Sequence, residues 1–325
     1  PSALPRRYEA GKRQFVEAFG VEVVETAHAL KDPAWLAKHP EARASDLMEA
    51  FADRSISGII STIGGEESIR ILPHIQLDVI ASNPKVFLGY SDTTVSHLAC
   101  FRAGLVSFYG PSFMAGFAEN AGMFPYMVES VRRTCFTAAP IGAVEPCRDG
   151  WTVEHLDWSN PDNQQQRRVL NPSHGWRYLQ GSGVVQGRLI GGCLEVLEWL
   201  RGTPIWPDAS CFDGAILFLE TSEEAPPPRD VVRVLRSYAA TGLLRRLSGL
   251  LVGRPGGGIP HERFAAYDDA ILQVVVEEEG LTHLPVVTQM DFGHTDPMFV
   301  LPFGLMAQID CDNRRFAILE SAVLD

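Results

Sequence analysis

The sequence has no long hydrophobic run and no excess of positive charge. No apolar stretch approaches the roughly 20 residues that a membrane-spanning helix requires. The formal net charge is −12 at pH 7, whereas nucleic acids and anionic membrane surfaces attract basic patches. We therefore expect neither a nucleic acid nor a membrane as a partner.

Cysteine is also sparse, and its spacing matches none of the common cysteine motifs. None of the six cysteines belongs to a C-x-x-C pair, and most lie in apolar surroundings. This pattern favours reduced, buried thiols in a cytoplasmic protein over disulfides. The histidines show no metal-ligand spacing with cysteines or carboxylates, so no metal and no other cofactor is expected.

The chain is nevertheless long and apolar enough to fold well. Its 325 residues, 46% of them hydrophobic, suffice for two ordinary domains with a core each. In the first half, predicted helices over 6–19 and 41–52 alternate with predicted strands over 20–24, 57–63, 86–88 and 106–109. Such alternation is typical of a doubly wound parallel sheet, whose sites lie at the carboxyl ends of strands.

A polar stretch that carries tryptophans follows this half. Residues 151–181 place Trp151, Trp158 and Trp176 among polar side chains, as in a linker or a functional loop. Strands are predicted beyond it over 184–190, 214–219, 247–252, 284–288, 306–310 and 316–319, with helices over 193–200, 230–240 and 262–279. We expect an α/β protein: an N-terminal doubly wound parallel-sheet domain over 1–140, a linker and recognition loop over 141–181, and a C-terminal α/β domain over 182–325.

The N-terminal domain, as printed, opens with a helix. Its parallel sheet would then lack one strand, and Pro1 is not an initiator residue. The start shows no signal-peptide pattern. We therefore expect a natural N-terminal segment that forms an apolar strand ahead of Pro1.

The most informative stretch runs over residues 84–105. An apolar strand ends at Gly89-Tyr90-Ser91-Asp92, and a helical pattern follows directly. Strand, tight turn and helix in this order expose a serine hydroxyl beside free backbone amides, as in the nucleophile elbow G-x-S-x-G. The sequence matches this motif only in part, because its fifth position is Thr93 instead of glycine. The alternative is that Ser91, Asp92 and Thr93 only cap the helix, since all three are good N-cap residues.

Two further residues follow predicted strands. Glu220 comes directly after an apolar run and opens the acidic sequence that continues to Glu224, which alternatively is a solvated loop. His294 lies just beyond the strand predicted over 284–288, where a lone histidine is alternatively structural. The order serine, glutamate, histidine suits a catalytic triad: imidazole removes the serine proton, and a carboxylate fixes the imidazole tautomer. Backbone amides near Gly64-Gly65 and at Asp92 would stabilise an oxyanion.

These motifs together resemble the LD-carboxypeptidase family of serine peptidases. The resemblance covers the whole chain and rests on four stretches, which are Gly89–Thr94, Ile63–Gly65, Leu219–Glu220 and Phe292–His294. Other stretches, such as GLVSFYGPS and FGHTDPMFVLPFG, resemble the microcin C immunity branch of that family. The resemblance implies Ser91 as nucleophile, His294 as base and Glu220 as its orienting partner, with the amides of Gly65 and Asp92 as the oxyanion hole.

The same resemblance implies how the site is divided and what it acts on. Ser91 would belong to the N-terminal domain, and the other two triad residues to a swivelling C-terminal domain of a homodimer. The implied substrate is a small aminoacyl- or peptidyl-nucleotide of the microcin C type, cut at the amide between its aminoacyl and nucleotide parts. Two alternatives stay open: cleavage of murein tetrapeptides, and a non-enzymatic binding protein on the same fold.

Three residues are expected to contact the substrate. Gly64 belongs to the glycine pair at the end of a neighbouring strand, which could lend an N–H to an oxyanion. Cys193 stands where many family members have asparagine, so a polar contact there is in question, and a buried apolar role is the alternative. Trp176 is expected to overhang the cleft and stack on a nucleotide base. The alternative is that Trp151, Trp158 and Trp176 only hold their loop to the domain surface.

Overall fold

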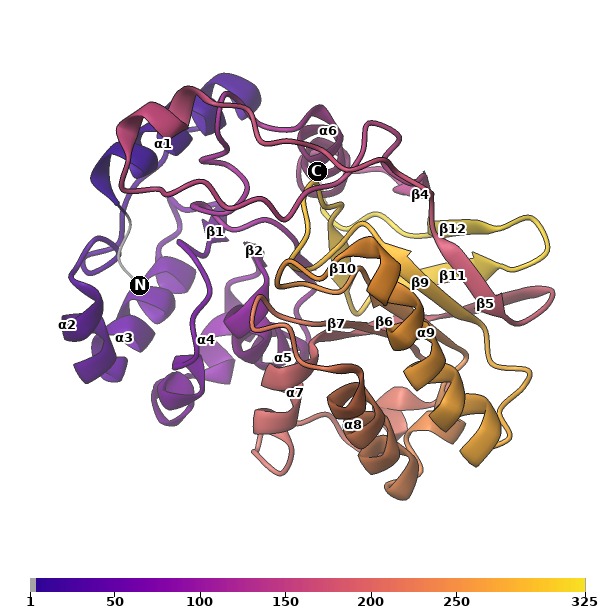
Figure 1. The fold of residues 1–325 in the computed structure, drawn as a ribbon. Helices are drawn as coiled ribbons and strands as arrows, with labels where there is room; N and C mark the ends of the chain where they lie inside the picture. The colour runs from indigo at the N-terminus through magenta and orange to yellow at the C-terminus, as the bar shows by residue number, and fades with distance from the viewer. Residues whose placement is uncertain (1–3, 325) are drawn as a thin grey trace.

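The computed structural model describes residues 4–324, whose strands form two sheets flanked by helices (Figure 1). The smaller sheet has the order β1-β2-β3-β10. Its strands β1, β2 and β3 are parallel, and β10 pairs antiparallel with β3. Their bounds are β1 Gly58–Ile60, β2 Val86–Gly89, β3 Ser107–Tyr109 and β10 Leu301–Phe303. The strand expected ahead of Pro1 lies outside the described residues.

The larger sheet has eight strands in the order β4-β12-β11-β6-β7-β8-β9-β5. Its centre, β6 to β9, is parallel, and the outer strands are antiparallel. The residues of β7 and β9 are buried throughout, as expected for parallel strands covered on both faces. The bounds are β4 Gly142–Val144, β5 Arg177–Gln180, β6 Val184–Cys193, β7 Ile216–Glu220, β8 Gly249–Gly253, β9 Val286–Met290, β11 Met306–Asp310 and β12 Arg315–Ile318.

The helices fall into an N-terminal group beside the smaller sheet and a later group beside the larger one (Figure 1). Several, including α1, α3 and α6, begin with a proline, whose fixed φ suits the first helical position. No helix in residues 4–324 is long and apolar enough to cross a membrane. The bounds are α1 Pro5–Phe19, α2 Pro33–Lys38, α3 Pro40–Ala52, α4 Leu77–Ser82, α5 Thr94–Arg102, α6 Pro125–Cys135, α7 Leu194–Leu200, α8 Pro228–Ala240 and α9 Phe264–Leu272.

The mixed α/β architecture agrees with the sequence, but two predicted elements differ. Residues 20–24 are irregular rather than a strand. Val21 and Val23 pack on an aromatic cluster, so the alternating pattern is satisfied by burial of one side without strand pairing. The helix predicted over 262–279 is α9 preceded by a 3₁₀ turn and followed by a π-helical turn, Gln273–Glu278.

Strand pairing crosses the boundaries that the sequence predicted between domains. β4 and β5, from the segment before residue 182, pair in the larger sheet, and β10 from the C-terminal part completes the smaller one. The segment between β4 and β5 runs across to α1 and returns (Figure 1). The largest core cluster also includes residues that follow β2 together with those of the larger sheet. The two sheets therefore share a core, and the predicted domain boundaries stay a prediction.

Candidate active site

Ser91 lies at a sharp turn between β2 and α5. Its φ is +64°, a left-handed conformation that a non-glycine residue adopts only when its surroundings impose it. The hydroxyl groups of Thr93 and Thr94 donate to the carbonyls of Tyr90 and Ser91, both at 2.7 Å. Neither the short 3₁₀ turn Ser91–Thr93 nor α5 has a side-chain cap. The structure therefore shows the strained turn of an elbow, and Ser91 Oγ is not used as a helix cap.

The loop that follows β1 packs closely against Ser91. A Cβ on Gly64 would lie 2.9 Å from both Cβ and Oγ of Ser91 and 3.5 Å from the Asp92 nitrogen, so only glycine fits. The carboxylate of Asp92 accepts hydrogen bonds from the backbone of Glu67 and from the backbone and hydroxyl of Ser68. These bonds fix the Gly64–Gly65 loop to the elbow and bring two backbone segments beside the serine hydroxyl.

The structure brings the three residues of the predicted triad into hydrogen-bond distance. His294 Nε2 is 3.0 Å from Ser91 Oγ, and His294 Nδ1 is 2.6 Å from Glu220 Oε2. The ring of Tyr90 packs edge-on against the imidazole, with centroids 4.9 Å apart. The serine hydroxyl, imidazole and carboxylate thus form a continuous chain, the arrangement in which a neutral imidazole can accept a serine proton.

Glu220 is the last residue of β7 and is fully buried. Its Oε1 accepts a hydrogen bond from the Tyr109 hydroxyl, which in turn accepts one from the Ser91 amide at 3.1 Å. Burial, and then the nearby Glu220 charge, raise the pKa of Tyr109 well above its usual value, so the phenol remains a donor. Gly293 (φ +93°) approaches Glu220 so closely that a Cβ would lie 2.6 Å from the Glu220 Cβ.

A second carboxylate contacts the imidazole from the opposite side. Glu223 Oε2 lies 3.0 Å from His294 Nε2, the same nitrogen that faces Ser91. Burial alone lowers the pKa of His294, but the charges and hydrogen bonds of Glu220 and Glu223 outweigh it and raise that pKa to about 10. The hydrogen bond to His294, opposed by burial, lowers the pKa of Glu223 to about 2. The imidazole is therefore stabilised as an imidazolium between two carboxylates.

Cys193 is at the end of β6, directly beside Glu220 in the sheet. It is buried, and its thiol donates to Glu195 at 3.4 Å. Burial, followed by the charges of Glu220 and Glu195, raises the pKa of the thiol well above its usual value. This placement favours the alternative that Cys193 is a buried core residue, and its amide contributes instead by donating to Thr94 at 3.1 Å.

Trp176 lies in the core rather than over the cleft, which corrects the expected overhang. Its indole is 9% exposed and packs against Phe299 and Phe316. The indole N–H donates to Asp291 at 2.6 Å, and the same carboxylate also pairs with Arg254. The sequence does not reveal this placement, because a buried carboxylate partner such as Asp291 cannot be recognised from the residues around Trp176. The placement favours the alternative that Trp176 holds its segment to the protein.

An ion cluster connects that same segment to both halves of the site. Arg168, from the stretch between β4 and β5, pairs with buried Glu119 and, at 2.8 Å, with Asp296. Thr152 exchanges two backbone hydrogen bonds with Asp296, at 2.7 and 2.9 Å. The loop that carries His294 is therefore fixed by the linker that precedes β5.

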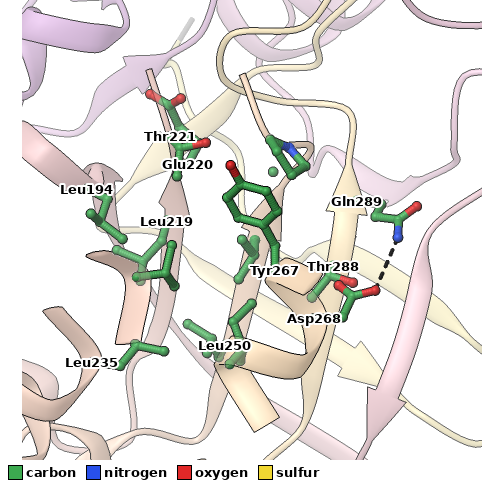
Figure 2. Close-up of a pocket in the computed structure, with 15 residues that line it drawn as sticks. Leu194, Leu219, Glu220, Thr221, Leu235, Leu250, Tyr267, Asp268, Thr288 and Gln289 are labelled. Carbon is green, nitrogen blue, oxygen red and sulfur yellow. Dashed lines mark hydrogen bonds between the residues drawn. The ribbon is translucent and has the colours of Figure 1, made fainter. Parts of the chain in front are cut away.

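A small cavity lies behind Glu220, between the larger sheet and its helices (Figure 2). Leucine side chains from β7, β8, α7 and α8 form much of its wall. Glu220 and Thr221 lie at one side in this view, and Asp268, bonded to Gln289 at 3.2 Å, at the other. The lining is largely apolar, so the cavity belongs to the packing that supports Glu220.

Sequence reasoning missed Tyr109, Glu223 and Arg168. Tyr109 ends a predicted strand, and the three triad residues follow predicted strands. Its position at a strand end was therefore the feature from which its place in the site could have been predicted. Glu223 belongs to an acidic run that was predicted as a possible solvated loop. Arg168 had no signal, because its partners lie 49 and 128 residues away in the chain.

The fold and the comparisons with known proteins define a serine hydrolase with a mixed α/β architecture. The chain belongs to the LD-carboxypeptidase family: the family model of the N-terminal domain matches residues 1–110, and that of the C-terminal domain matches residues 186–309. Within the family it belongs to the branch of the microcin C immunity protein MccF.

Individual relatives agree over nearly the full chain. The microcin C7 self-immunity protein MccF of Escherichia coli is 28% identical, over 94% of this chain and 86% of its own length. A probable murein peptide carboxypeptidase of Bacillus subtilis is 26% identical, over 95% and 86%.

Solved structures show the same fold. A MccF-like protein from Streptococcus pneumoniae, crystallised with AMP, superposes with a TM-score of 0.87 at 32% identity, covering 97% of this chain and 93% of that one. MccF in complex with aspartyl sulfamoyl adenosine superposes with a TM-score of 0.79 at 27% identity, covering 98% and 92%.

Proposed function

We propose that this protein is a serine carboxypeptidase or amidase that hydrolyses the amide bond of aminoacyl- or peptidyl-nucleotides of the microcin C type. The proposed reaction type rests on one observation: His294 contacts Ser91 Oγ on one side and Glu220 on the other. The substrate class rests on similarity to structures that hold AMP and aspartyl sulfamoyl adenosine.

The proposed reaction follows from the geometry. Ser91 Oγ attacks the amide carbonyl while neutral His294 takes its proton at Nε2. The amides of Gly65 and Asp92 donate to the resulting oxyanion, and Gly64 leaves room for the substrate beside Ser91. His294 then protonates the leaving nitrogen, and water, activated by the same imidazole, releases the acyl group. Glu220 holds the proton on Nδ1 throughout.

In the cell, this activity would detoxify compounds that mimic aminoacyl-nucleotides and would protect an aminoacyl-tRNA synthetase. We propose that the enzyme acts in the cytoplasm, as a homodimer, and without a cofactor. Removal of divalent metals with EDTA should then leave turnover unchanged. Loss of activity that zinc restores would contradict the serine mechanism.

A second candidate function is cleavage of murein tetrapeptides. It is favoured by the similarity to the murein peptide carboxypeptidase of Bacillus subtilis. To separate the two, the protein is incubated with an aspartyl sulfamoyl adenosine and, separately, with a murein tetrapeptide, and products are followed by mass spectrometry.

The expected result is release of the amino acid from the nucleoside at a higher kcat/KM than release of alanine from the peptide. The reverse order would favour the murein function. Ser91→Ala protein is the control in both reactions. Binding of a ligand without turnover, unchanged by Ser91→Ala, would instead indicate a non-enzymatic binding protein.

A further inference from the structure

The base of the triad contacts two carboxylates that differ in their surroundings. Glu220 is fully buried and bonded to Tyr109, whereas the Glu223 side chain is 74% exposed. Both contact His294, but Glu223 reaches Nε2, the atom that must accept the proton of Ser91. Glu223 and the nucleophile therefore compete for one nitrogen.

This competition determines the charge of the resting base. An imidazole that faces a carboxylate at each nitrogen is most stable when both nitrogens carry protons. The pKa of His294, raised to about 10 against the effect of burial, agrees with this geometry. An imidazolium has no free electron pair for the serine proton, so the base at neutral pH is held in the inactive protonation state.

The backbone of Glu223 is held by its neighbours, while its side chain is largely exposed. Its neighbour Ser222 donates twice to Glu195, through its amide at 3.1 Å and its hydroxyl at 2.6 Å. On the other side, Gly257 approaches the Glu223 carbonyl so closely that a Cβ would lie 2.6 Å from it. A partner that attracts the Glu223 carboxylate would therefore need only a side-chain rotation.

The cations near His294 are already paired with other groups. From the adjacent loop, Arg254 pairs with Asp291, and from the linker, Arg168 pairs with Glu119 and Asp296. The Tyr90 ring, which also faces the imidazole, has its pKa raised by burial and then by neighbouring carboxylates, so it is uncharged. Within residues 4–324, the one ion pair of Glu223 is with His294.

We propose that Glu223 binds a cationic group of the substrate next to the scissile bond, and that this pairing draws Glu223 away from His294 and frees Nε2 for Ser91. The inference rests on the proposed function for its substrate: the α-ammonium group of an aminoacyl compound is bonded to the carbon next to the scissile carbonyl. A substrate without that cation, such as a peptidyl-nucleotide, would meet a protonated base more often and would be cleaved more slowly.

The proton balance is simple. The resting imidazolium donates from Nδ1 to Glu220, and its Nε2 lies 3.0 Å from both Ser91 Oγ and Glu223 Oε2. When the substrate cation pairs with Glu223, the imidazolium loses the stabilising charge of that carboxylate, and the proton on Nε2 leaves to solvent. The neutral tautomer that remains keeps its proton on Nδ1 and presents its lone pair to Ser91.

A titration that needs no turnover tests the charge control directly. The protein is labelled with ¹⁵N-histidine, His294 is assigned with a His294→Gln variant, and its pKa is measured by NMR. Glycinamide, an ammonium next to an amide, is the probe, and N-acetylglycinamide is the uncharged control at equal ionic strength. Glu223→Gln is compared with Glu224→Gln, which removes an equal charge from the adjacent exposed residue.

We expect Glu223→Gln to lower the pKa of His294, and glycinamide to lower it in the wild type but not in Glu223→Gln. Glu224→Gln should resemble the wild type in both measurements. If Glu223→Gln leaves the pKa unchanged, or if glycinamide acts no differently from its acetylated analogue, the proposal is wrong, whichever substrate the enzyme cleaves.

A selectivity measurement then tests the consequence for catalysis. The ratio of kcat/KM for an aspartyl sulfamoyl adenosine to that for its N-acetyl derivative should fall in Glu223→Gln by about ten-fold, the loss expected for a hydrogen bond to a charged group. It should stay constant in Glu224→Gln. An unchanged ratio in Glu223→Gln overturns the proposal. The two proposals can fail separately. If the wild type cleaves neither compound, the proposed function is wrong. If the titration nevertheless gives the expected result, the proposal that Glu223 binds a cation is still supported.

Discussion

The half of the site on the smaller sheet and the half on the larger sheet are stabilised by different interactions. Around Ser91, the partners are backbone amides, hydroxyl groups and close glycine contacts. Around His294, they are the carboxylates of Glu220 and Glu223 and a chain of ion pairs. The contacts of the first half hold Ser91 in position, whereas those of the second half determine the charge of His294. In the proposed mechanism, the reactivity of Ser91 depends on the protonation of His294, which lies 203 residues away in the chain.

Removing either member of the contact between the two halves should have the largest effect. Ser91→Ala or His294→Ala should lower kcat by about 10⁴- to 10⁶-fold, because triad members act as a unit. Steady-state kinetics with the substrate that the wild type cleaves provides the measurement, and Ser55→Ala, at an exposed serine, is the control. A loss of less than about 100-fold in either variant would show that the pair is not the reacting pair.

Removing the charge of Glu220 without changing the shape of its side chain should lower activity less. Glu220→Gln keeps the nucleophile and base in place but no longer fixes the tautomer, and we expect kcat to fall by about 10⁴-fold or less. Glu224→Gln should change kcat little. A loss equal to that of Ser91→Ala would mean that the carboxylate does more than orient the imidazole.

The Tyr109 hydroxyl connects the two halves of the site, because it bonds both the Ser91 amide and Glu220. Removing it tests whether this connection matters for catalysis. Tyr109→Phe removes the donor to Glu220 and leaves the buried Ser91 amide without a partner, at a cost of about 1–3 kcal/mol in the free energy of unfolding. We expect a fall in kcat of about ten-fold together with a lower Tm. Tyr267→Phe, which removes a hydroxyl bonded to the Pro226 carbonyl instead, should lower kcat little. A normal kcat in Tyr109→Phe would show that the bridge is structural only.

The smallest effect on catalysis is expected from a substitution in the hydrophobic core beside the larger sheet. Trp176→Ala removes a buried indole, and large-to-small core substitutions of this kind cost about 3–5 kcal/mol in the free energy of unfolding. Tm should fall strongly, while KM of the folded enzyme for an adenylate-type substrate changes little. Trp199→Ala, at a residue 42% exposed, is the control and should leave Tm nearly unchanged. A several-fold rise in KM with an unaltered Tm would instead support base stacking by Trp176.

The comparison also explains which features could be predicted from the sequence. Local patterns sufficed for the elbow, since apolar run, tight turn and helix are consecutive around Ser91. Glu220 and His294 could be placed because each lies at or shortly beyond the end of a predicted strand. Glu223 could not, because its role depends on a side-chain direction within a polar loop. Trp176 was misplaced for a different reason, because its partner Asp291 is 115 residues away in the chain.

Errors in the fold have a related cause. The valines over 20–24 alternate as in a strand, but alternation reports only that one side is buried. The short strand β10 was not predicted, because only its pairing with β3 marks these residues as a strand. Long-range pairing decides both cases, and it is not encoded in any one window of sequence.

The pairing of β10 with β3 has a consequence for how the protein is made. During synthesis the smaller sheet must wait with an open edge at β3 until residues 301–303 leave the ribosome, and open edges invite pairing with other chains. His294 lies only seven residues before β10, so this histidine and the strand that closes the sheet emerge almost together. A nascent chain halted before this point would carry Ser91 but not His294. The contact between these two side chains therefore forms late in synthesis, in the same step that closes the open edge of the smaller sheet.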